Sequence, residues 1–363
     1  MKITDIRLGH LSVPLKQPFK TALRTVNSVE DVIVKIDTDT GHIGYGEAPP
    51  TGVITGDTTG AIIGAIEEHI RKRLIGLDLE NFEEILLTLD KSIVHNTSTK
   101  AAVDIALYDL YGQMFKAPVY KLLGGFRQEI ITDITISVDT PEKMAADSIE
   151  AVKLGYTTLK IKVGVDAEQD IRRMKAIREA VGYDVQLRID ANQGWKPKEA
   201  VATLKTMEDT GLQVELVEQP VQAQDIEGLK FVTEQVSIPV MADESVFSPK
   251  DALTILQTRA ADLINIKLMK CGGIHQALKI CAMAEIYDVE CMIGCMLEAK
   301  VSVTAAVHLA CAKKVITKID LDGPVLCRED PVAGGAIFEH SRISLPDTPG
   351  LGFEQIGGVL WKS

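Results

Sequence analysis

The sequence lacks long runs of apolar residues. No stretch approaches the roughly 18 consecutive apolar residues that a helix needs to span a bilayer. The first residues, MKITDIRLGH, contain no apolar segment of the kind found in signal peptides. We therefore predict a cytoplasmic protein that does not bind a membrane.

Cysteine is scarce, and every cysteine lies after residue 270. The set contains no CxxC pair and has no histidine nearby at zinc-finger spacing. We expect reduced and mostly buried thiols rather than disulfides or a zinc site. The six are Cys271, Cys281, Cys291, Cys295, Cys311 and Cys327.

Positive charge is also deficient. The chain has 39 Lys and Arg residues against 51 Asp and Glu residues, which gives a net charge of −12 at pH 7. Nucleic acids and anionic membranes need a positive surface that displaces counterions. The expected partner is therefore a small molecule. With 363 residues and 46% hydrophobic content, the chain can form one large domain and a smaller one.

From residue 131 onward, short β-branched runs alternate with segments of helical periodicity. Such alternation favours a parallel sheet, and eight strands of this kind can close into a barrel. After the last strand, GPVLCREDPVAGG has the glycine and proline content of a loop, so the final helix is expected to be missing. We predict an α/β fold with a (β/α)7β barrel over residues 126–330. The candidate strands begin at residues 131, 158, 185, 214, 238, 263, 289 and 317.

Residues 1–125 have a different pattern. Strand-like runs surround TDTG, which predicts a hairpin, and three segments of helical periodicity follow. These features indicate an α+β domain. We expect the tail, residues 331–363, to pack back on this domain.

Three consecutive predicted strands end in an acid, at Asp190, Glu218 and Asp243. In a barrel of this type the active site lies at the C-terminal rim of the strands. Converging carboxylates repel one another unless a cation lies among them. Oxygen ligands favour Mg²⁺, with Mn²⁺ as an alternative, over zinc, which prefers His or Cys. The alternative role for each acid is to cap the following helix.

Two predicted strands carry lysines that face the barrel interior. In TLKIKV, Lys160 and Lys162 share a face, and in LINIKL, Asn265 and Lys267 share one. Lysine is rarely buried without a functional reason. The second and sixth strands lie on opposite sides of an eight-stranded barrel, so Lys162 and Lys267 would flank the metal. As neutral amines of lowered pKa, they could remove and return an α-proton beside a carboxylate. The alternative, strongest for Lys160, is simple pairing with the acids.

Taken together, these residues resemble the enolase superfamily, in particular its muconate-lactonising subgroup. The resemblance covers essentially the whole chain. It implies a capping domain over the barrel, Mg²⁺ on the three acids and acid/base roles for Lys162 and Lys267, a use of lysine and Mg²⁺ already known for this superfamily. The marks are KIK at 160–162, DAN at 190–192, EQP at 218–220, DES at 243–245, the Lys267 strand, AAVDIALYDLYG and PVYKLLGG.

The resemblance also implies a substrate class. Asp320 and Asp322 form an Asp-x-Asp on the last strand, similar to the pair that holds the substrate ammonium in dipeptide epimerases. Two loops of the capping domain, at 21–25 and 49–57, are expected to close the site. Arg24 resembles the arginine that meets the side-chain carboxylate of the substrate in Ala-Glu epimerases. We therefore favour L-Ala-D/L-Glu epimerisation, an isomerase activity.

Several alternatives stay open. Dipeptides with hydrophobic or cationic second residues, or a cycloisomerase, o-succinylbenzoate synthase or N-acylamino acid racemase reaction, would use the same barrel. A non-catalytic small-molecule-binding barrel is the alternative outside enzymes. Arg24 could be a solvated loop charge and Glu298 a helix cap. We also expect a homo-oligomer. The further candidate substrate contacts are Ile54, Thr135, Lys160, Met296 and Glu298.

Overall fold

The computed structural model describes residues 1–21 and 23–362. Its largest sheet has eight parallel strands in the order β12-β11-β10-β9-β8-β7-β6-β5. The backbone N–H of Asp133 donates to the carbonyl of Ile319 at 3.3 Å, which brings the two edges together. The predicted (β/α)7β barrel is confirmed. The strands are β5 (Ile134–Ile136), β6 (Thr158–Lys162), β7 (Gln186–Asp190), β8 (Val214–Glu218), β9 (Val240–Ala242), β10 (Leu263–Lys267), β11 (Cys291–Gly294) and β12 (Ile316–Asp320).

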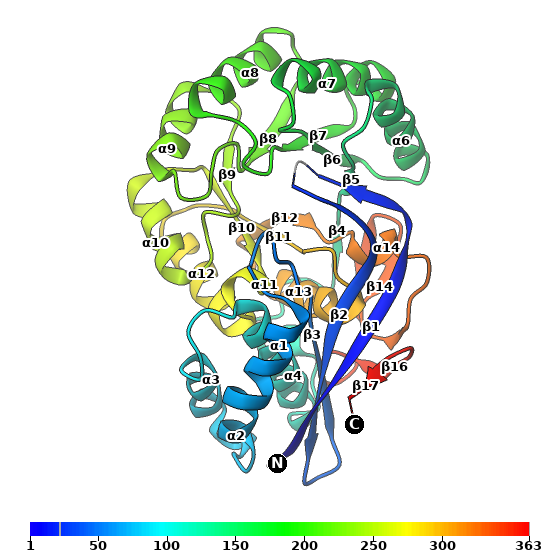
Figure 1. Cartoon of the computed structure of the whole chain (residues 1–363), viewed down its shortest axis with the longest axis vertical. Coiled ribbons are helices and arrows are strands. Elements are labelled where there is room, and N and C mark those ends of the chain that lie inside the picture. The colour runs from blue at the N-terminus through cyan, green and yellow to red at the C-terminus, as the bar shows by residue number, and fades with distance from the viewer. Residues whose placement is uncertain (22, 363) are drawn as a thin grey trace.

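The helices that connect these strands form an outer layer around the sheet (Figure 1). Several begin at a side chain that accepts a hydrogen bond from the first turn, as Thr140, Asp166 and Ser248 do. Among the described residues after β12, the single helix is α14 (Gly323–Leu326), so a full-length eighth helix is missing, as predicted. The outer helices are α6 (Pro141–Lys153), α7 (Ala167–Val181), α8 (Pro197–Asp209), α9 (Ile226–Gln235), α10 (Pro249–Thr258), α11 (Leu268–Cys271), α12 (Ile274–Ile286) and α13 (Lys300–Ala312).

The N-terminal part is a sheet covered by helices. Strands β1 (Ile3–Lys20), β2 (Thr25–Thr38) and β3 (Ile43–Ala48) pair antiparallel, with the predicted hairpin between β2 and β3. Glycine lets β3 lie against the buried helix α4, because a Cβ on Gly46 would lie 1.8 Å from the carbonyl oxygen of Ala102. The helical segments are α1 (Thr59–Ala65), η1 (Ile66–Ile70), α2 (Arg71–Leu74), η2 (Leu79–Asn81), α3 (Phe82–Asp90), α4 (Thr97–Met114) and α5 (Val119–Leu122).

The C-terminal strands return to the N-terminal part. Strand β17 (Leu360–Trp361) pairs with β1, and β15 pairs with β4, the short strand that precedes the barrel. The residue boundaries of the domains stay a prediction. The remaining strands are β4 (Glu129–Ile131), β13 (Val332–Gly334), β14 (Ile337–Glu339), β15 (Arg342–Ser344) and β16 (Phe353–Ile356).

The end of β1 and the start of β2 lie near β5 of the barrel (Figure 1). The backbone N–H of Val138 donates to the carbonyl of Lys20 at 3.2 Å, and the Lys20 ammonium lies 2.7 Å from the carboxylate of Asp139. These contacts place the loop with Arg24 over the C-terminal ends of the strands. Within the described residues, no helix combines the length and the apolar character that crossing a membrane requires. All six cysteines are free thiols, five of them buried and Cys295 half-buried.

Candidate active site

Three acids lie side by side at the C-terminal ends of adjacent strands. Asp190 ends β7 and is in register with Glu218, which ends β8. Asp243 follows β9 directly, and its backbone N–H donates to the side-chain oxygen of Gln219 at 2.9 Å. At most 1% of each acid is exposed. The strand ends predicted from the sequence therefore bring three buried carboxyl groups together.

Lysines from β6 and β10 reach these acids from two sides. The ammonium of Lys162 lies 2.6 Å from Asp190 Oδ2, and that of Lys267 lies 2.8 Å from Asp243 Oδ2. Strands β7, β8 and β9 separate the two lysine-bearing strands. The amines therefore flank the acids from opposite sides, as the strand positions predict.

Lys160 makes a different set of contacts. Its Nζ lies 2.6 Å from Asp320 Oδ2, 2.7 Å from Glu218 Oε2 and 3.2 Å from Asp190 Oδ2. Although burial lowers the pKa of Lys160, these carboxylates raise it well above its ordinary value. Lys160 is therefore a buried ammonium that joins the acids at the centre to the last strand.

The lysines give the three acids unequal pKa values. Burial raises the pKa of Asp190, but Lys162 and Lys160 hold it at about 2. Asp243, beside Lys267, likewise has a pKa well below its ordinary value despite burial. Burial and the charge of Asp190 raise the pKa of Glu218 to about 7. The site therefore combines two strongly acidic groups with one that holds a proton near neutrality.

The pKa of Lys267 differs from the expectation of a lowered amine pKa. Burial lowers it, but Asp243 and Glu218 raise it above the ordinary value of lysine. The expectation rested on desolvation and on nearby cations, whereas the charges within 4 Å of Nζ are those of Asp243 and Glu218. In this charge state Lys267 is an ammonium and a proton donor.

The carboxylate oxygens of the three acids are chemically suited to bind a hard divalent cation. As the side chains stand, no group of three or more His, Cys, Asp or Glu residues in the described chain is close enough to hold a metal ion. However, Glu218 Oε2 and Asp243 Oδ1 are buried oxygens that accept no hydrogen bond, although each lies near an ammonium. Oxygens with free lone pairs on adjacent strand ends are the ligands that Mg²⁺ prefers.

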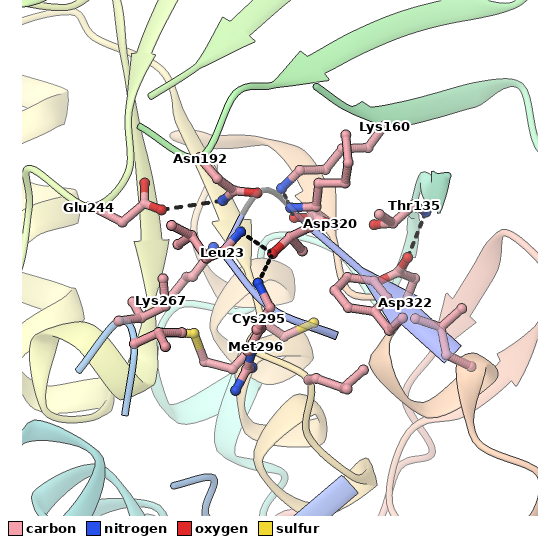
Figure 2. A pocket seen from close by; sticks show the side chains of 18 residues that line it. Leu23, Thr135, Lys160, Asn192, Glu244, Lys267, Cys295, Met296, Asp320 and Asp322 are labelled. Atoms are coloured by element: carbon pink, nitrogen blue, oxygen red, sulfur yellow. Dashed lines mark hydrogen bonds and ion pairs between the residues drawn. The ribbon is translucent and has the colours of Figure 1, made fainter. Parts of the chain in front are cut away.

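A pocket opens above these groups, between the barrel rim and the two N-terminal loops. Figure 2 shows Lys160 and Asp320 entering it from one side and Lys267 from the other. Its lining combines charged and polar side chains with apolar ones. The lining residues are Phe19, Thr21, Leu23, Arg24, Val53, Ile54, Thr135, Lys160, Lys162, Asn192, Glu244, Lys267, Cys295, Met296, Leu297, Asp320, Asp322 and Leu326.

Two family models match the chain. Residues 3–124 match the mandelate racemase / muconate lactonizing enzyme N-terminal domain, and residues 143–355 match the enolase C-terminal domain-like family. The chain belongs to the mandelate racemase / muconate lactonizing enzyme family of the enolase superfamily. The predicted resemblance is confirmed.

Relatives within this family carry names that describe epimerases. The chain is 67% identical to the L-Ala-D/L-Glu epimerase of Clostridium acetobutylicum over 98% of its length and 99% of that protein. A substrate-liganded complex of the L-Ala-D/L-Glu epimerase from Bacillus subtilis matches with a TM-score of 0.97 and 52% identity, covering 98% of this chain and all of that one. A dipeptide epimerase from Enterococcus faecalis, complexed with Mg and L-Leu-L-Tyr, matches with a TM-score of 0.95 and 48% identity over 98% and 100% of the two chains.

Seven of the eight predicted substrate contacts line the pocket. Arg24, Ile54 and Met296 are among them, and burial lowers the pKa of Arg24. Asp322 Oδ2 accepts a hydrogen bond from the backbone N–H of Thr135 at 2.7 Å. Burial and the neighbouring Asp320 raise the pKa of Asp322 to about 6, whereas Lys160 lowers that of Asp320 against the effect of burial.

Glu298 does not line the pocket. Its carboxyl group accepts a hydrogen bond from the backbone N–H of Met296 at 2.6 Å, and its other oxygen lies within hydrogen-bonding distance of the Ser302 hydroxyl in the first turn of α13. Of the two roles considered for Glu298, these contacts favour the structural one at the start of the helix. The strand-end position alone did not reveal that the side chain turns away from the pocket.

Three polar residues near the acids carried no predicted role. Asn192 donates from Nδ2 to Glu244 Oε1 at 3.3 Å, and both side chains line the pocket. Both belong to motifs noted in the sequence: Asn192 is the third residue of DAN, and Glu244 is the second residue of DES. Lys270 is completely buried beneath Asp243, and its only signal was its place three residues after Lys267.

Proposed function

We propose that this protein is a metal-dependent dipeptide epimerase, an isomerase, acting on L-Ala-D/L-Glu. The observation that carries the proposal is the pair of lysines on opposite sides of three buried carboxyl groups. A 1,1-proton transfer needs a group on each face of the α-carbon, and Lys162 and Lys267 lie on facing strands of the barrel. The family relationship and the names of the relatives support the same activity.

In this proposal, Asp190, Glu218 and Asp243 hold Mg²⁺, with Mn²⁺ as an alternative. When bound, the ion stabilises the negative charge that builds up on the substrate carboxylate as the α-proton leaves. Lys162 and Lys267 each remove or return that proton, one on each face. Loss of the proton to one lysine and gain from the other inverts the α-carbon.

The pocket walls supply the groups that a dipeptide needs. Asp320 and Asp322 would bind the N-terminal ammonium, and Arg24 would bind the side-chain carboxylate of glutamate through its planar fork. Thr135 holds Asp322 in place through its backbone N–H. Lys160 would position Asp320, while Ile54 and Met296 would cover the apolar parts of the substrate.

The direct test is incubation of L-Ala-L-Glu with the protein and MgCl₂ in D₂O. We expect deuterium at the glutamyl α-carbon and the appearance of L-Ala-D-Glu, measured by NMR. The alanyl α-position is the internal control, because its carbon does not lie beside the free carboxylate. If the glutamyl α-proton does not exchange, the epimerase proposal fails for this substrate.

A second candidate substrate is a dipeptide with a hydrophobic second residue. The observation in its favour is the apolar part of the pocket lining, formed by Leu23, Val53, Ile54, Met296 and Leu297. A screen of L-Ala-L-Xaa dipeptides separates the two candidates. A higher kcat/KM for Glu than for Leu or Tyr supports the first, and the opposite order supports the second. Cationic second residues belong to the same screen.

Other reactions of the superfamily fit the pocket less well. Substrates of cycloisomerases, o-succinylbenzoate synthases and N-acylamino acid racemases carry no free ammonium, so Asp320 and Asp322 would lack a partner. A non-catalytic binding barrel leaves three acids and three lysines at the strand ends without a role. The cytoplasmic location and the homo-oligomeric state stay predictions.

A further inference from the structure

Lys270 is a buried cation that the proposed reaction does not use. It lies on α11, the four-residue helix that directly follows Lys267 at the end of β10. Its side chain is 0% exposed and does not line the pocket. A buried ammonium is costly unless its donors are all satisfied. The contacts of Lys270 should therefore reveal its role.

The oxygens around the Lys270 ammonium belong to β10 and to the residue that follows β9, and the Phe247 ring lies over it with its centroid 5.9 Å from Nζ. The ammonium donates to the backbone carbonyl of Asp243 and, at 3.0 Å, to that of Asn265. It also lies 2.6 Å from Asp243 Oδ1, an ion pair rather than a well-aligned hydrogen bond, because this oxygen accepts none. Two N–H donors of Lys270 are thus directed at backbone carbonyls, and its charge lies beside the Asp243 carboxylate.

These contacts fix the acid that follows β9 on two sides. Asp243 Oδ2 is held by Lys267 at 2.8 Å, and Oδ1 by Lys270 at 2.6 Å. The final torsion of an aspartate side chain has broad minima, so a carboxylate held at one oxygen only can rotate. Lys270 also reaches the backbone of Asn265, whose side chain donates to Glu218 Oε1 at 2.9 Å. One cation therefore connects two of the three acids.

We propose that Lys270 is a positioning residue that fixes the Asp243 carboxylate in the orientation needed to bind Mg²⁺ and to align Lys267. The inference rests on the proposed function for the identity of the ion and the reaction. Residues that orient metal ligands from behind affect metal affinity or activity by about 10- to 100-fold. Lys270 does not line the pocket, so its loss should affect the binding of the dipeptide itself little.

The test compares Lys270→Met and Lys270→Gln with the unmodified protein. Calorimetric titration with MgCl₂ and no dipeptide gives the Mg²⁺ affinity, and kcat and KM for L-Ala-L-Glu follow at saturating Mg²⁺. We expect a 10- to 100-fold loss of Mg²⁺ affinity and of kcat, with KM changed less than threefold. Lys270→Gln keeps an amide donor for the carbonyls, so it provides a folded variant if Lys270→Met does not fold.

The matched control is Lys300→Met. Lys300 is also a nearly buried lysine in an ion pair, with Asp330, but it does not contact the three acids. This variant should keep the Mg²⁺ affinity and kcat of the unmodified protein. Folded Lys270 variants with Mg²⁺ affinity and kcat within twofold of the unmodified protein would overturn the inference, even if their Tm falls. Failure of the proposed function would give a different result: the unmodified protein would bind Mg²⁺ but would not exchange the α-proton of the dipeptide.

Discussion

Two clusters of buried acids within residues 1–21 and 23–362 differ in the pKa values of their aspartates, whereas Glu218 in one and Glu298 in the other both have raised pKa values. At the rim of the barrel, Asp190 and Asp243 lie beside lysines, and their pKa values are lowered although both are buried. Where β2 and β3 meet the start of α13, Asp31 and Glu47 are equally buried, and burial raises their pKa values. The same residue type therefore carries charge in one place and holds protons in the other.

The cluster at α13 has hydrogen-bond donors but no close lysine. Asp31 accepts from the backbone N–H of Ala299 at 3.0 Å, and Glu47 accepts from the N–H and the hydroxyl of Ser302. The same hydroxyl oxygen lies within hydrogen-bonding distance of Glu298, and because burial raises the pKa of Glu298 to about 7, a protonated Glu298 can donate to it. Neutral donors satisfy oxygens without stabilising charge as strongly as an ammonium does. This cluster therefore joins the N-terminal sheet to the barrel, whereas the lysine-paired cluster is suited to chemistry.

The largest expected effect follows from removing one of the lysines at the rim of the barrel. Lys162→Ala and Lys267→Ala should each lower kcat for epimerisation by about 10²- to 10⁴-fold, because each removes the only proton carrier on one face. The measurement is the appearance of L-Ala-D-Glu by NMR, with circular dichroism to check the fold.

Lys318→Ala is the matched control for the two lysines. Lys318 lies on β12 two residues before Asp320, and its ammonium contacts Glu290 at 3.2 Å rather than the three acids. It should keep kcat within about twofold. Substantial turnover by Lys162→Ala or Lys267→Ala would rule out the assignment of two proton carriers.

The next largest effect concerns the cluster at the start of α13, formed by Asp31, Glu47 and Glu298. Because the pKa of Glu298 rises from 4.5 to about 7 on folding, the folded protein binds its proton more tightly than the unfolded chain. The resulting stability is fully present below about pH 4.5 and is lost as pH rises through about 7. Relative to Glu298→Gln, which cannot titrate, the unmodified protein should lose up to about 3 kcal/mol of unfolding free energy over this range.

Urea unfolding of both proteins between pH 4 and pH 8 measures this difference. Glu285→Gln, an exposed residue of α12, is the control whose curve should run parallel to that of the unmodified protein. Parallel curves for Glu298→Gln would contradict the raised pKa. Because Glu298 does not line the pocket, we also expect Glu298→Gln to keep KM for L-Ala-L-Glu within about threefold.

The sequence predicts the lysine-paired cluster better than the other one. Period-two alternation and strand ends located Lys162, Lys267 and the acids, since parallel strands bring such positions to one rim. Lys270 lies on a helix of one turn, too short to show a period. Ser302, one partner of Glu298, lies on the following helix, and Asp31 and Glu47 lie on strands more than 250 residues away. Such contacts depend on how the parts pack, which no local pattern contains.

The smallest expected effect concerns Asp320 and Asp322, two neighbouring acids whose pKa values are shifted in opposite directions. Asp320 pairs with Lys160 and has a lowered pKa, whereas Asp322, two residues later, has a pKa raised to about 6 and accepts from a backbone N–H. A charged carboxylate attracts a substrate ammonium more strongly than a partly protonated one. Asp320→Asn should therefore raise KM for L-Ala-L-Glu about tenfold at pH 6, where about half of Asp322 is protonated, and Asp322→Asn less. N-acetyl-L-Ala-L-Glu, which has no ammonium, is the control substrate, and its weaker binding should not change with Asp320→Asn. Equal effects of Asp320→Asn on both substrates would mean that Asp320 acts through Lys160 alone, and the reason for assigning an ammonium to this wall would be lost.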